Sequence, residues 1–204
     1  MCGFVAVSIN NLNNNFTIND LRRMRSKISH RGPDDSGLIF IDDNQNIKDA
    51  EYFENQTKIS AGLAFHRLSI MDISKDGHQP MISNCEKYVI VFNGEIYNFK
   101  ELKKKYFYSS DIFKSSSDTE VILNLYIKYG SKMLELLNGM FSICIYDLKE
   151  NIIFLARDRL GIKPLYYYHK DNSFIAASEI KPFLSFPEYK FRLNDQKFSE
   201  YLCF

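Results

Sequence analysis

The 204-residue chain has no tryptophan, no long apolar run and almost no net charge. No hydrophobic stretch approaches the roughly 20 residues that a transmembrane helix requires, which argues against a membrane-spanning protein. Its 26 basic and 25 acidic residues leave a formal charge of +1, so no overall field attracts nucleic acid or an anionic membrane. The N-terminus carries no basic region ahead of its short apolar run, which argues against a secretory signal. These absences favour a cytoplasmic protein.

Cysteine is scarce as well, and its spacing excludes the usual cysteine-based scaffolds. The four cysteines stand far apart, at positions 2, 85, 144 and 203, with no CxxC pair and no cysteine–histidine cluster spaced for zinc. We therefore expect reduced thiols and no metal site. The sequence also lacks internal repeats and low-complexity segments, and its length fits one domain with one core.

Phenylalanine and tyrosine, in contrast, are abundant, with 17 and 13 residues, and they suit sheets with large packed faces. The order strand, helix, strands, helices, strands predicts an α+β fold of two stacked antiparallel sheets with helices outside. The run Asn93-Gly94-Glu95 is expected to end the strand at 88–92 by reversing the chain. Strands are expected at 4–8, 36–41, 59–66, 88–92, 140–147, 152–157, 165–169 and 174–178, and helices at 17–30, 99–106, 118–129, 133–137 and 198–204.

Cys2 directly follows the initiator methionine, and removal of Met1 is favoured by a small second residue. Cys2 would then carry a free α-amine beside its thiol. The ordinary pKa values, about 7.7–8.0 for the amine and about 8.5 for the thiol, lie close enough to neutrality for a modest push to give a usable base and thiolate. An N-terminal nucleophile that uses its own amine as base is a recognised arrangement. A cysteine at this position can equally be incidental, so the rest of the chain must decide.

Six short motifs stand in a fixed order between positions 1 and 167. Each is weak alone; Asn-Gly, for example, is a common hairpin turn. Together they resemble the N-terminal glutaminase domain of glutamine-dependent asparagine synthetases, which are class II glutamine amidotransferases. The motifs are Met1-Cys2-Gly3, His30-Arg31-Gly32-Pro33-Asp34, Arg67-Leu68-Ser69-Ile70, Asn93-Gly94-Glu95-Ile96-Tyr97-Asn98, Ser117-Asp118 and Arg157-Asp158-Arg159-Leu160-Gly161-Ile162-Lys163-Pro164-Leu165-Tyr166-Tyr167.

The resemblance implies the N-terminal nucleophile hydrolase fold, a four-layer αββα sandwich, which agrees with the strand order. It covers nearly the whole chain, and we expect the amidotransferase domain to occupy residues 1–195. Because the chain stops on the apolar run Tyr-Leu-Cys-Phe, residues 196–204 are expected to begin a linker or helix into a C-terminal synthetase domain.

The resemblance also implies an activity, the hydrolysis of L-glutamine to glutamate and ammonia. Cys2 would form a γ-glutamyl thioester, with its α-amine moving the proton. The family assigns the oxyanion donors to the Asn93 side chain and the Gly94 N–H. Fixed donors of this kind are typically worth about 2.7–4 kcal/mol each.

The same resemblance assigns the two charged ends of glutamine to opposite charges in the site. Arg67 would clamp the α-carboxylate and Asp118 would hold the α-ammonium, with Glu95 at the same end. Taken alone, Arg67 can be a surface ion pair and Asp118 a helix N-cap. Backbone contacts and a wall are assigned to Leu68, Ser69, Ile70 and Met71, where Met71 departs from the β-branched residue expected at that position.

The ammonia acceptor lies beyond these residues. Asparagine synthetases pair this domain with one that adenylates aspartate with ATP, yet the chain has no pyrophosphate-binding loop. We therefore expect no cofactor in this domain, and ATP and Mg²⁺ only in the synthetase domain. The expected partners are L-glutamine and that synthetase domain, with a homodimer left open. Alternatives are amidation of a sugar or another carboxylate in polysaccharide synthesis, another class II amidotransferase, or a non-catalytic domain of the same fold.

Two motifs carry no assigned chemistry. The loop of His30, Arg31 and Asp34 is expected near the site, with structural and functional roles both open. The segment 157–167 is expected to serve hairpin and interface structure.

Overall fold

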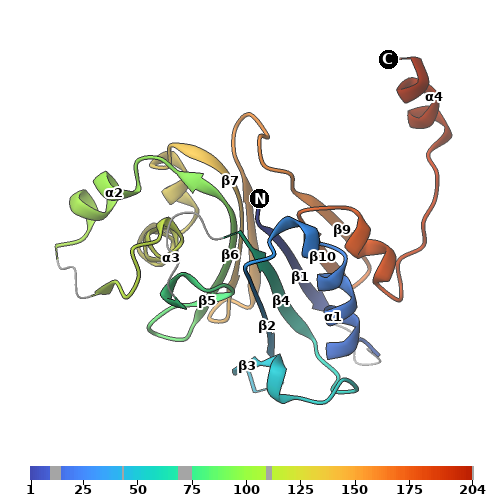
Figure 1. Ribbon diagram of the computed structural model, residues 1–204, viewed down its shortest axis with the longest axis horizontal. Coiled ribbons are helices and arrows are strands. Elements are labelled where there is room, and N and C mark those ends of the chain that lie inside the picture. Colours follow the sequence, from blue (N-terminus) through green and yellow to red (C-terminus); the bar gives the residue numbers. More distant parts are fainter. Residues whose placement is uncertain (10–14, 43, 69–74, 109–111, 204) are drawn as a thin grey trace.

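The computed structural model describes residues 1–9, 15–42, 44–68, 75–108 and 112–203. Within these residues the chain forms two antiparallel sheets that stack face to face, with helices on the outer side of each (Figure 1). The predicted α+β class and its four-layer αββα order are confirmed.

The larger sheet has six strands in the order β3-β2-β4-β1-β10-β9. Its strands are β1 (Gly3–Ile9), β2 (Asp35–Ile41), β3 (Ile47–Asp49), β4 (Ala61–Arg67), β9 (Tyr166–Lys170) and β10 (Ser173–Ala177). The smaller sheet has the order β5-β6-β7-β8 and contains β5 (Met81–Ile82), β6 (Tyr88–Ile96), β7 (Gly139–Asp147) and β8 (Ile152–Arg157).

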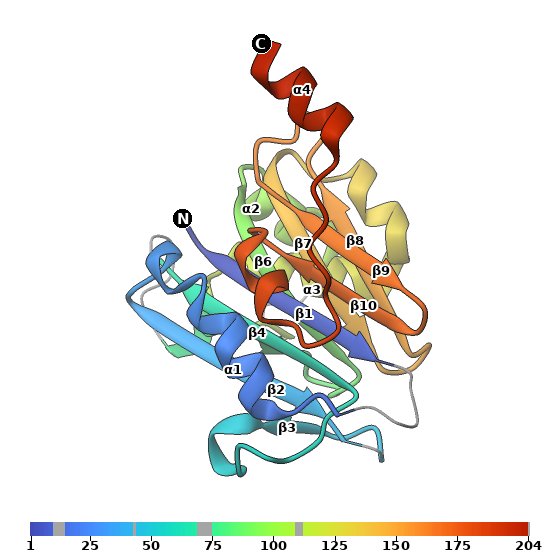
Figure 2. The ribbon, with the colours of Figure 1, turned by 90° about the vertical axis from the view of Figure 1, so that its right-hand side faces the viewer.

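The described helices are α1 (Ile18–Ser26), α2 (Phe99–Tyr106), α3 (Asp118–Tyr129) and α4 (Asp195–Cys203). Short 3-10 turns occur at η1 (Ser29–Arg31), η2 (Ala50–Tyr52), η3 (Lys75–Gly77), η5 (Gly130–Glu135) and η6 (Lys181–Ser185). Helix α4 buries none of its residues and projects from the body of the molecule (Figure 2). None of the helices in the described ranges is both long and apolar enough to cross a membrane.

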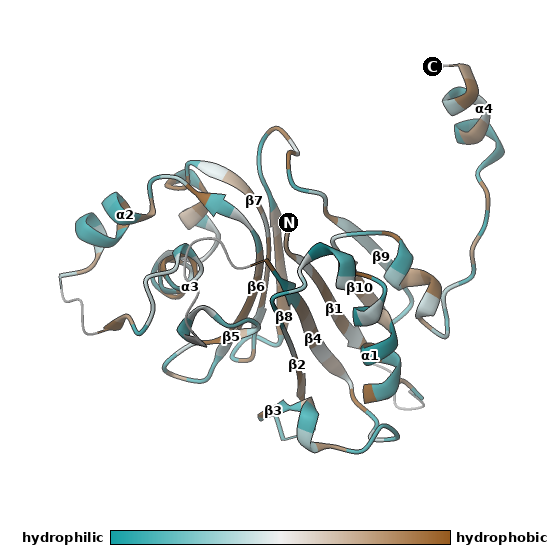
Figure 3. Cartoon of the chain, in the orientation of Figure 1, coloured by the Kyte–Doolittle hydropathy of each residue, from teal (hydrophilic) through white to brown (hydrophobic). Residues whose placement is uncertain are grey.

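Strand β1 lies in the middle of the six-stranded sheet, between β4 and β10 (Figure 2). Side chains alternate along a strand, so Val5 and Val7 pack beneath α1 while Phe4 and Ala6 face the second sheet. Both faces are therefore covered, which explains why the strand is continuously apolar from Phe4 to Val7 instead of alternating. Figure 3 shows hydrophobic colours along the strands and hydrophilic colours over much of α1 and α2.

Helix α1 begins at a reciprocal cap. The Thr17 hydroxyl accepts a hydrogen bond from the Asp20 N–H at 3.3 Å, and the Asp20 carboxylate accepts one from the Thr17 N–H at 2.9 Å. Such a cap typically stabilises a helix by about 1 kcal/mol. The helix buries Leu21 against Gly62 of β4, where an added Cβ would lie 2.5 Å from the leucine methyl. The glycine thus lets the helix layer approach the sheet closely.

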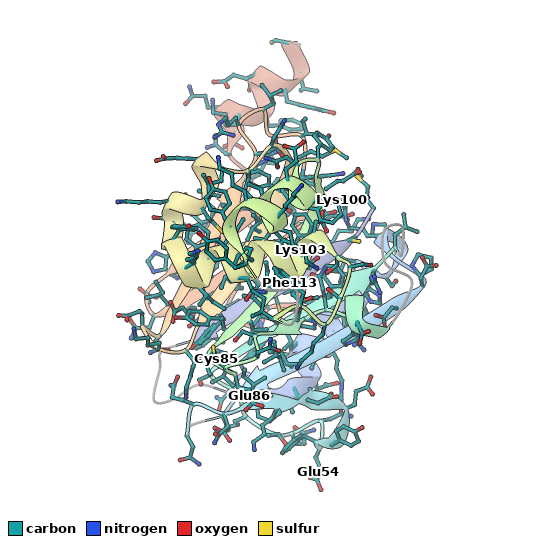
Figure 4. The ribbon with its side chains drawn as sticks, turned by 90° about the vertical axis from the view of Figure 1, so that its left-hand side faces the viewer. Glu54, Cys85, Glu86, Lys100, Lys103 and Phe113 are labelled. Atoms are coloured by element: carbon teal, nitrogen blue, oxygen red, sulfur yellow. The ribbon has the colours of Figure 1, made fainter. Side chains whose placement is uncertain are left out.

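The four-stranded sheet is covered on its outer side by α2 and α3, whose apolar faces contribute Leu102, Ile122 and Leu125. The outer face of α2 is rich in lysine and exposes Lys100, Lys104 and Lys105, and Figure 4 shows this side of the molecule. The strand β7 is buried from residue 141 to residue 147, so both of its faces are covered.

Two local predictions are wrong. The strand expected at 88–92 continues as β6 to Ile96, because pairing with β7 runs unbroken to Ile96↔Gly139. The helix expected at 133–137 is instead the 3-10 turn η5.

Candidate active site

A cavity of about 140 Å³ opens where the N-terminal end of β1 faces the end of β6. All seven predicted site residues that the structure describes line this cavity. They are Cys2, Arg67, Leu68, Asn93, Gly94, Glu95 and Asp118. The three remaining predicted residues, Ser69, Ile70 and Met71, lie outside the described residues.

The Cys2 sulfur is held by the backbone of one neighbour. Sγ accepts a hydrogen bond from the Leu68 N–H at 3.4 Å and lies 3.6 Å from the Leu68 carbonyl oxygen. Burial raises the pKa of the Cys2 thiol, while the Leu68 hydrogen bond and the charges of the N-terminus, Arg67 and Lys163 oppose that rise. The thiol is therefore enclosed yet surrounded by groups that favour its ionised form.

The loop whose role the sequence left open fixes the backbone of Cys2. The Arg31 Nε donates a hydrogen bond to the Cys2 carbonyl oxygen at 2.8 Å, and Arg31 Nη1 donates to Glu179 Oε1 at 3.0 Å. His30 Nε2 lies 2.8 Å from the same Glu179 oxygen. A Cβ at Gly3 would lie 2.7 Å from the arginine Cδ, so the glycine makes room for this contact. The sequence did not single out Glu179, which lies two residues after the end of β10.

Asn93 presents an unused hydrogen-bond donor at the cavity. Its side chain is 1% exposed, and its Nδ2 has no hydrogen-bond partner among the described residues. Buried polar atoms are rarely left unpaired, so this donor points to a ligand. Gly94 follows in the same strand, where a Cβ would lie 2.3 Å from the Met140 carbonyl oxygen of β7. A glycine is needed there because the two strands approach too closely for a side chain.

Asp118 begins α3, but it does not cap the helix as predicted. The N-cap is Ser117, whose hydroxyl accepts from the Glu120 N–H. The Asp118 carboxylate instead accepts from the Ile96 N–H of β6 at 2.9 Å. Burial raises the Asp118 pKa to about 6 against the hydrogen bonds to its carboxylate, and the charge of Glu95 adds to the rise. This buried acid is partly protonated near neutrality and would gain from a cationic partner.

Arg67 ends β4 and is only 8% exposed, which excludes the surface ion pair considered from the sequence. Two glycines allow the arginine its position. A Cβ at Gly77 would lie 2.2 Å from the Arg67 Nη2, and one at Gly32 would lie 2.3 Å from the Arg67 carbonyl carbon. The Arg67 guanidinium thus packs against Gly77, a turn residue without a side chain.

Lys163 also lines the cavity, although segment 157–167 was assigned only to structure. Its side chain is largely buried, and its Nζ lies 3.8 Å from the Met1 Sδ. The turn that delivers it is organised by Asp158, whose carboxylate accepts four backbone hydrogen bonds, from Phe141, Leu160, Ile162 and Lys163. The motif itself was the available signal, but its placement beside Cys2 depends on the fold.

Two histidines lie in elements that border the site. His78 Nδ1 lies 2.8 Å from the Asp35 carboxylate, and His66 is half-buried in β4. No group of three or more histidine, cysteine or acidic residues in the described ranges is arranged to hold a metal ion.

Comparison with known sequences identifies one family and several relatives, two of which are described here. A family model described as a glutamine amidotransferase domain matches residues 1–204. The chain is 40% identical over 192 residues to a putative glutamine-hydrolysing asparagine synthetase 2 of Methanocaldococcus jannaschii, covering 87% of this chain and 34% of that protein. It is also 40% identical over 178 residues to the glutamine-hydrolysing asparagine synthetase 2 of Bacillus subtilis, covering 87% and 21%.

The fold has solved counterparts. The glutamine phosphoribosylpyrophosphate amidotransferase from B. subtilis, complexed with ADP and GMP, superposes with a TM-score of 0.72 at 21% identity. The match covers 90% of this chain and 43% of that one, and at this identity it shows the fold alone. The chain spans about a third or less of the two curated relatives described above.

Proposed function

The chain belongs to the glutamine amidotransferase domain family, and from this premise we propose that it hydrolyses L-glutamine through a thioester on Cys2. The observation that carries the proposal is the pairing in one cavity of the Cys2 thiol with the buried, unpartnered Asn93 amide. A nucleophile and a donor without a partner are the two groups that attack on an amide carbonyl requires.

In the proposed reaction the Cys2 sulfur attacks the side-chain amide carbon of glutamine. The α-amine of Cys2, freed by removal of Met1, takes the thiol proton and gives it to the departing nitrogen, which leaves as ammonia. The carbon–nitrogen bond breaks and a γ-glutamyl thioester remains. Water then attacks the thioester, with the same amine accepting its proton, and releases glutamate and the thiol.

The negative oxygen of each tetrahedral intermediate would be held by the Asn93 Nδ2 and the Gly94 N–H. The geometry supports this role because outward N–H groups alternate along β6. Those of Phe92 and Ile96 point away from β7, where they meet Gln79 and Asp118. The N–H of Gly94 lies between them on the same edge, facing the cavity.

The two charged ends of glutamine would be held by opposite charges of the cavity. We assign the α-carboxylate to Arg67 and the α-ammonium to Asp118, with Glu95 at the same end. Binding of the ammonium stabilises the ionised form of Asp118, so it offsets the cost of burying this carboxylate. Leu68, Ser69, Ile70 and Met71 remain the proposed backbone wall of the pocket.

Removal of Met1 has a second consequence in this geometry. The Met1 side chain lines the cavity and contacts Lys163, so its loss both frees the α-amine and enlarges the space beside Cys2. The structure carries Met1, and the proposed mechanism requires the processed chain.

The ammonia is proposed to pass to a synthetase domain of the asparagine synthetase type, in which ATP and Mg²⁺ would act. The names of the two curated relatives support this acceptor, and the amidotransferase unit is proposed to span 1–195. On this proposal, the described chain binds L-glutamine and the synthetase domain but needs no cofactor of its own.

Intact-mass spectrometry under acid quench tests the proposal. The active protein should lack Met1 and, during turnover, gain the mass of one γ-glutamyl group, which Cys2→Ala should abolish. Cys85→Ala is the matched control, because Cys85 is an exposed thiol outside the cavity (Figure 4). Active protein that retains Met1 would overturn the amine mechanism, and an adduct that survives Cys2→Ala would overturn the nucleophile.

A further inference from the structure

The outer edge of β6 is paired for only part of its length. Strand β5 pairs through Met81↔Ile90 and Ile82↔Val89, and then it ends. Beyond Ile90 the same edge runs past Asn93 to the cavity, and no further strand of the described residues lies alongside it. An open edge leaves backbone donors to be satisfied by other groups.

The side chain of Gln79 takes the place of the missing strand. Its Oε1 accepts a hydrogen bond from the Phe92 N–H at 2.7 Å, one residue before Asn93. Its Nε2 donates to the Thr119 hydroxyl at 3.2 Å, one residue after Asp118. Gln79 is 5% exposed and lines the cavity, so this link is buried beside the site.

We propose that Gln79 is a positioning residue that fixes the oxyanion donors of β6 relative to the ammonium site on α3. The proposal rests on the function proposed above. The side-chain amide of Gln79 bridges the backbone N–H of Phe92, the residue before Asn93, and the first turn of α3, the helix that carries Asp118. Glutamine bound between these two groups would span the distance that Gln79 sets.

The backbone of Gln79 is itself fixed by close packing. A Cβ at Gly37 of β2 would lie 2.2 Å from the Gln79 carbonyl oxygen. Two residues earlier, Gly77 lies against the guanidinium of Arg67. The segment 77–79 therefore contacts the proposed carboxylate clamp through its backbone, and it contacts the oxyanion strand and the ammonium helix through Gln79. Because this segment contacts all three of these groups, none of the three proposed subsites can shift far unless the others shift as well.

The effect of breaking this bridge should fall on the transition state. A shift of about 1 Å in a catalytic group can cost about 100-fold in rate. Loss of the bridge should lower kcat about 10- to 100-fold. KM should change little, because the Arg67 and Asp118 contacts exist already in the bound substrate.

The experiment compares Gln79→Met, which removes both hydrogen bonds at similar volume, with Gln56→Met, the same change at an exposed loop residue. Four quantities are measured on the processed protein: kcat and KM for glutamine, the Kd of glutamate, and the inhibition constant of glutamate γ-semialdehyde. The aldehyde adds to the Cys2 thiol and places an oxygen where the oxyanion forms. We expect Gln79→Met to lower kcat and to raise the inhibition constant of the aldehyde by similar factors. The Kd of glutamate should stay unchanged.

The variant Gln79→Glu keeps an acceptor for the Phe92 N–H and covers the case in which Gln79→Met does not fold. Its introduced carboxylate would oppose the oxyanion once ionised, so kcat should fall with rising pH relative to the unmodified protein. Parallel pH profiles, an unchanged kcat in Gln79→Met, or equal losses for aldehyde and glutamate would each overturn the positioning role. If the unmodified protein neither hydrolyses glutamine nor forms the aldehyde adduct, the proposed function itself fails.

Discussion

The two sheets contribute different kinds of group to the cavity. Cys2 stands at the start of β1, a central strand that is paired on both sides and held further by Arg31. Asn93 and Gly94 stand on β6 and line the cavity, and the edge of β6 beyond Ile90 is not paired with β5. The six-stranded sheet thus holds the proposed nucleophile next to a strand that is paired on both sides, while the four-stranded sheet carries the proposed oxyanion donors on a strand with one edge only partly paired. The firmly held thiol and the unpaired Asn93 donor therefore come from different sheets.

The largest effect should come from removing the group supplied by the six-stranded sheet. Cys2→Ala should lower glutaminase turnover by on the order of 10⁴-fold or more, because among the described residues that line the cavity Cys2 alone carries a thiol. The other sheet remains intact, so isothermal calorimetry should still detect glutamine binding. Turnover near the unmodified level would contradict the division between the sheets, and Cys85→Ala serves as the control for loss of a thiol.

Next in size is removal of the side-chain donor at the open edge. Asn93→Ala should lower kcat about 10²- to 10³-fold, equivalent to about 2.7–4 kcal/mol of transition-state stabilisation, and should leave KM nearly unchanged. Steady-state kinetics with glutamine measures both parameters. A change in KM alone would assign Asn93 to ground-state binding, and Asn124→Ala on the outer part of α3 provides a matched control.

A smaller effect with a distinct pH signature should follow Asp118→Asn. Because the Asp118 pKa is raised to about 6, the carboxylate loses its charge as pH falls through 6, and KM of the unmodified protein should rise there. The variant should have a KM about 10-fold or more higher at pH 8, with no inflection near pH 6. Measuring KM between pH 5 and pH 8 checks both, and an inflection that survives the substitution would move the titrating group elsewhere.

The same substitution should stabilise the fold. The pKa of a buried carboxyl raised above its unfolded value makes stability fall as pH rises between about 4 and 6, since the folded state binds more protons there. Asp118→Asn removes this penalty and should raise the free energy of unfolding at pH 7 by about 1–3 kcal/mol. Urea unfolding at pH 4 and pH 7 measures it. Equal or lower stability of the variant at pH 7 would show that burial does not dominate at this site.

The smallest effect should come from Lys163, whose charge opposes the rise in the Cys2 pKa. Lys163→Met should move the pH profile of Cys2 alkylation to higher pH. It should also slow alkylation at pH 7 about twofold to fivefold, as expected for a screened charge worth up to about 1 kcal/mol. Lys104→Met, on the exposed face of α2, is the control. Identical pH profiles of alkylation for the unmodified protein and the two variants would show that the charge of Lys163 does not act on the Cys2 thiol.

Much of the fold was predictable because its strands are local apolar runs. The motifs also identified Cys2, Arg67, Asn93 and Asp118, which the structure gathers around one cavity. The prediction that β6 stops before Asn93 was wrong because the Asn-Gly turn signal is local, whereas pairing with β7 is not. Pairing with β7, a strand far away in the sequence, outweighed the local turn signal.

The remaining contacts of the site were beyond local patterns. The link from Arg31 to Glu179 joins residues 148 positions apart, and that from Gln79 to Thr119 joins residues 40 apart. Asp118 was predicted as an N-cap because serine and aspartate stand together, and only the position of β6 decides which of them caps the helix. Such choices depend on which strand faces which helix.

The pairing of β1 with β10 places a limit on when the site can form during synthesis. Val5 pairs with Ala177, so the strand that follows Cys2 waits for nearly the whole domain before its second neighbour exists. At about 5–20 residues per second, a ribosome takes about 10–30 seconds to cover that separation. An aminopeptidase can reach Met1 on the nascent chain during this interval, before the sheet closes. The order of translation therefore lets processing precede assembly, and a ribosome-bound fragment that lacks β10 should release no ammonia.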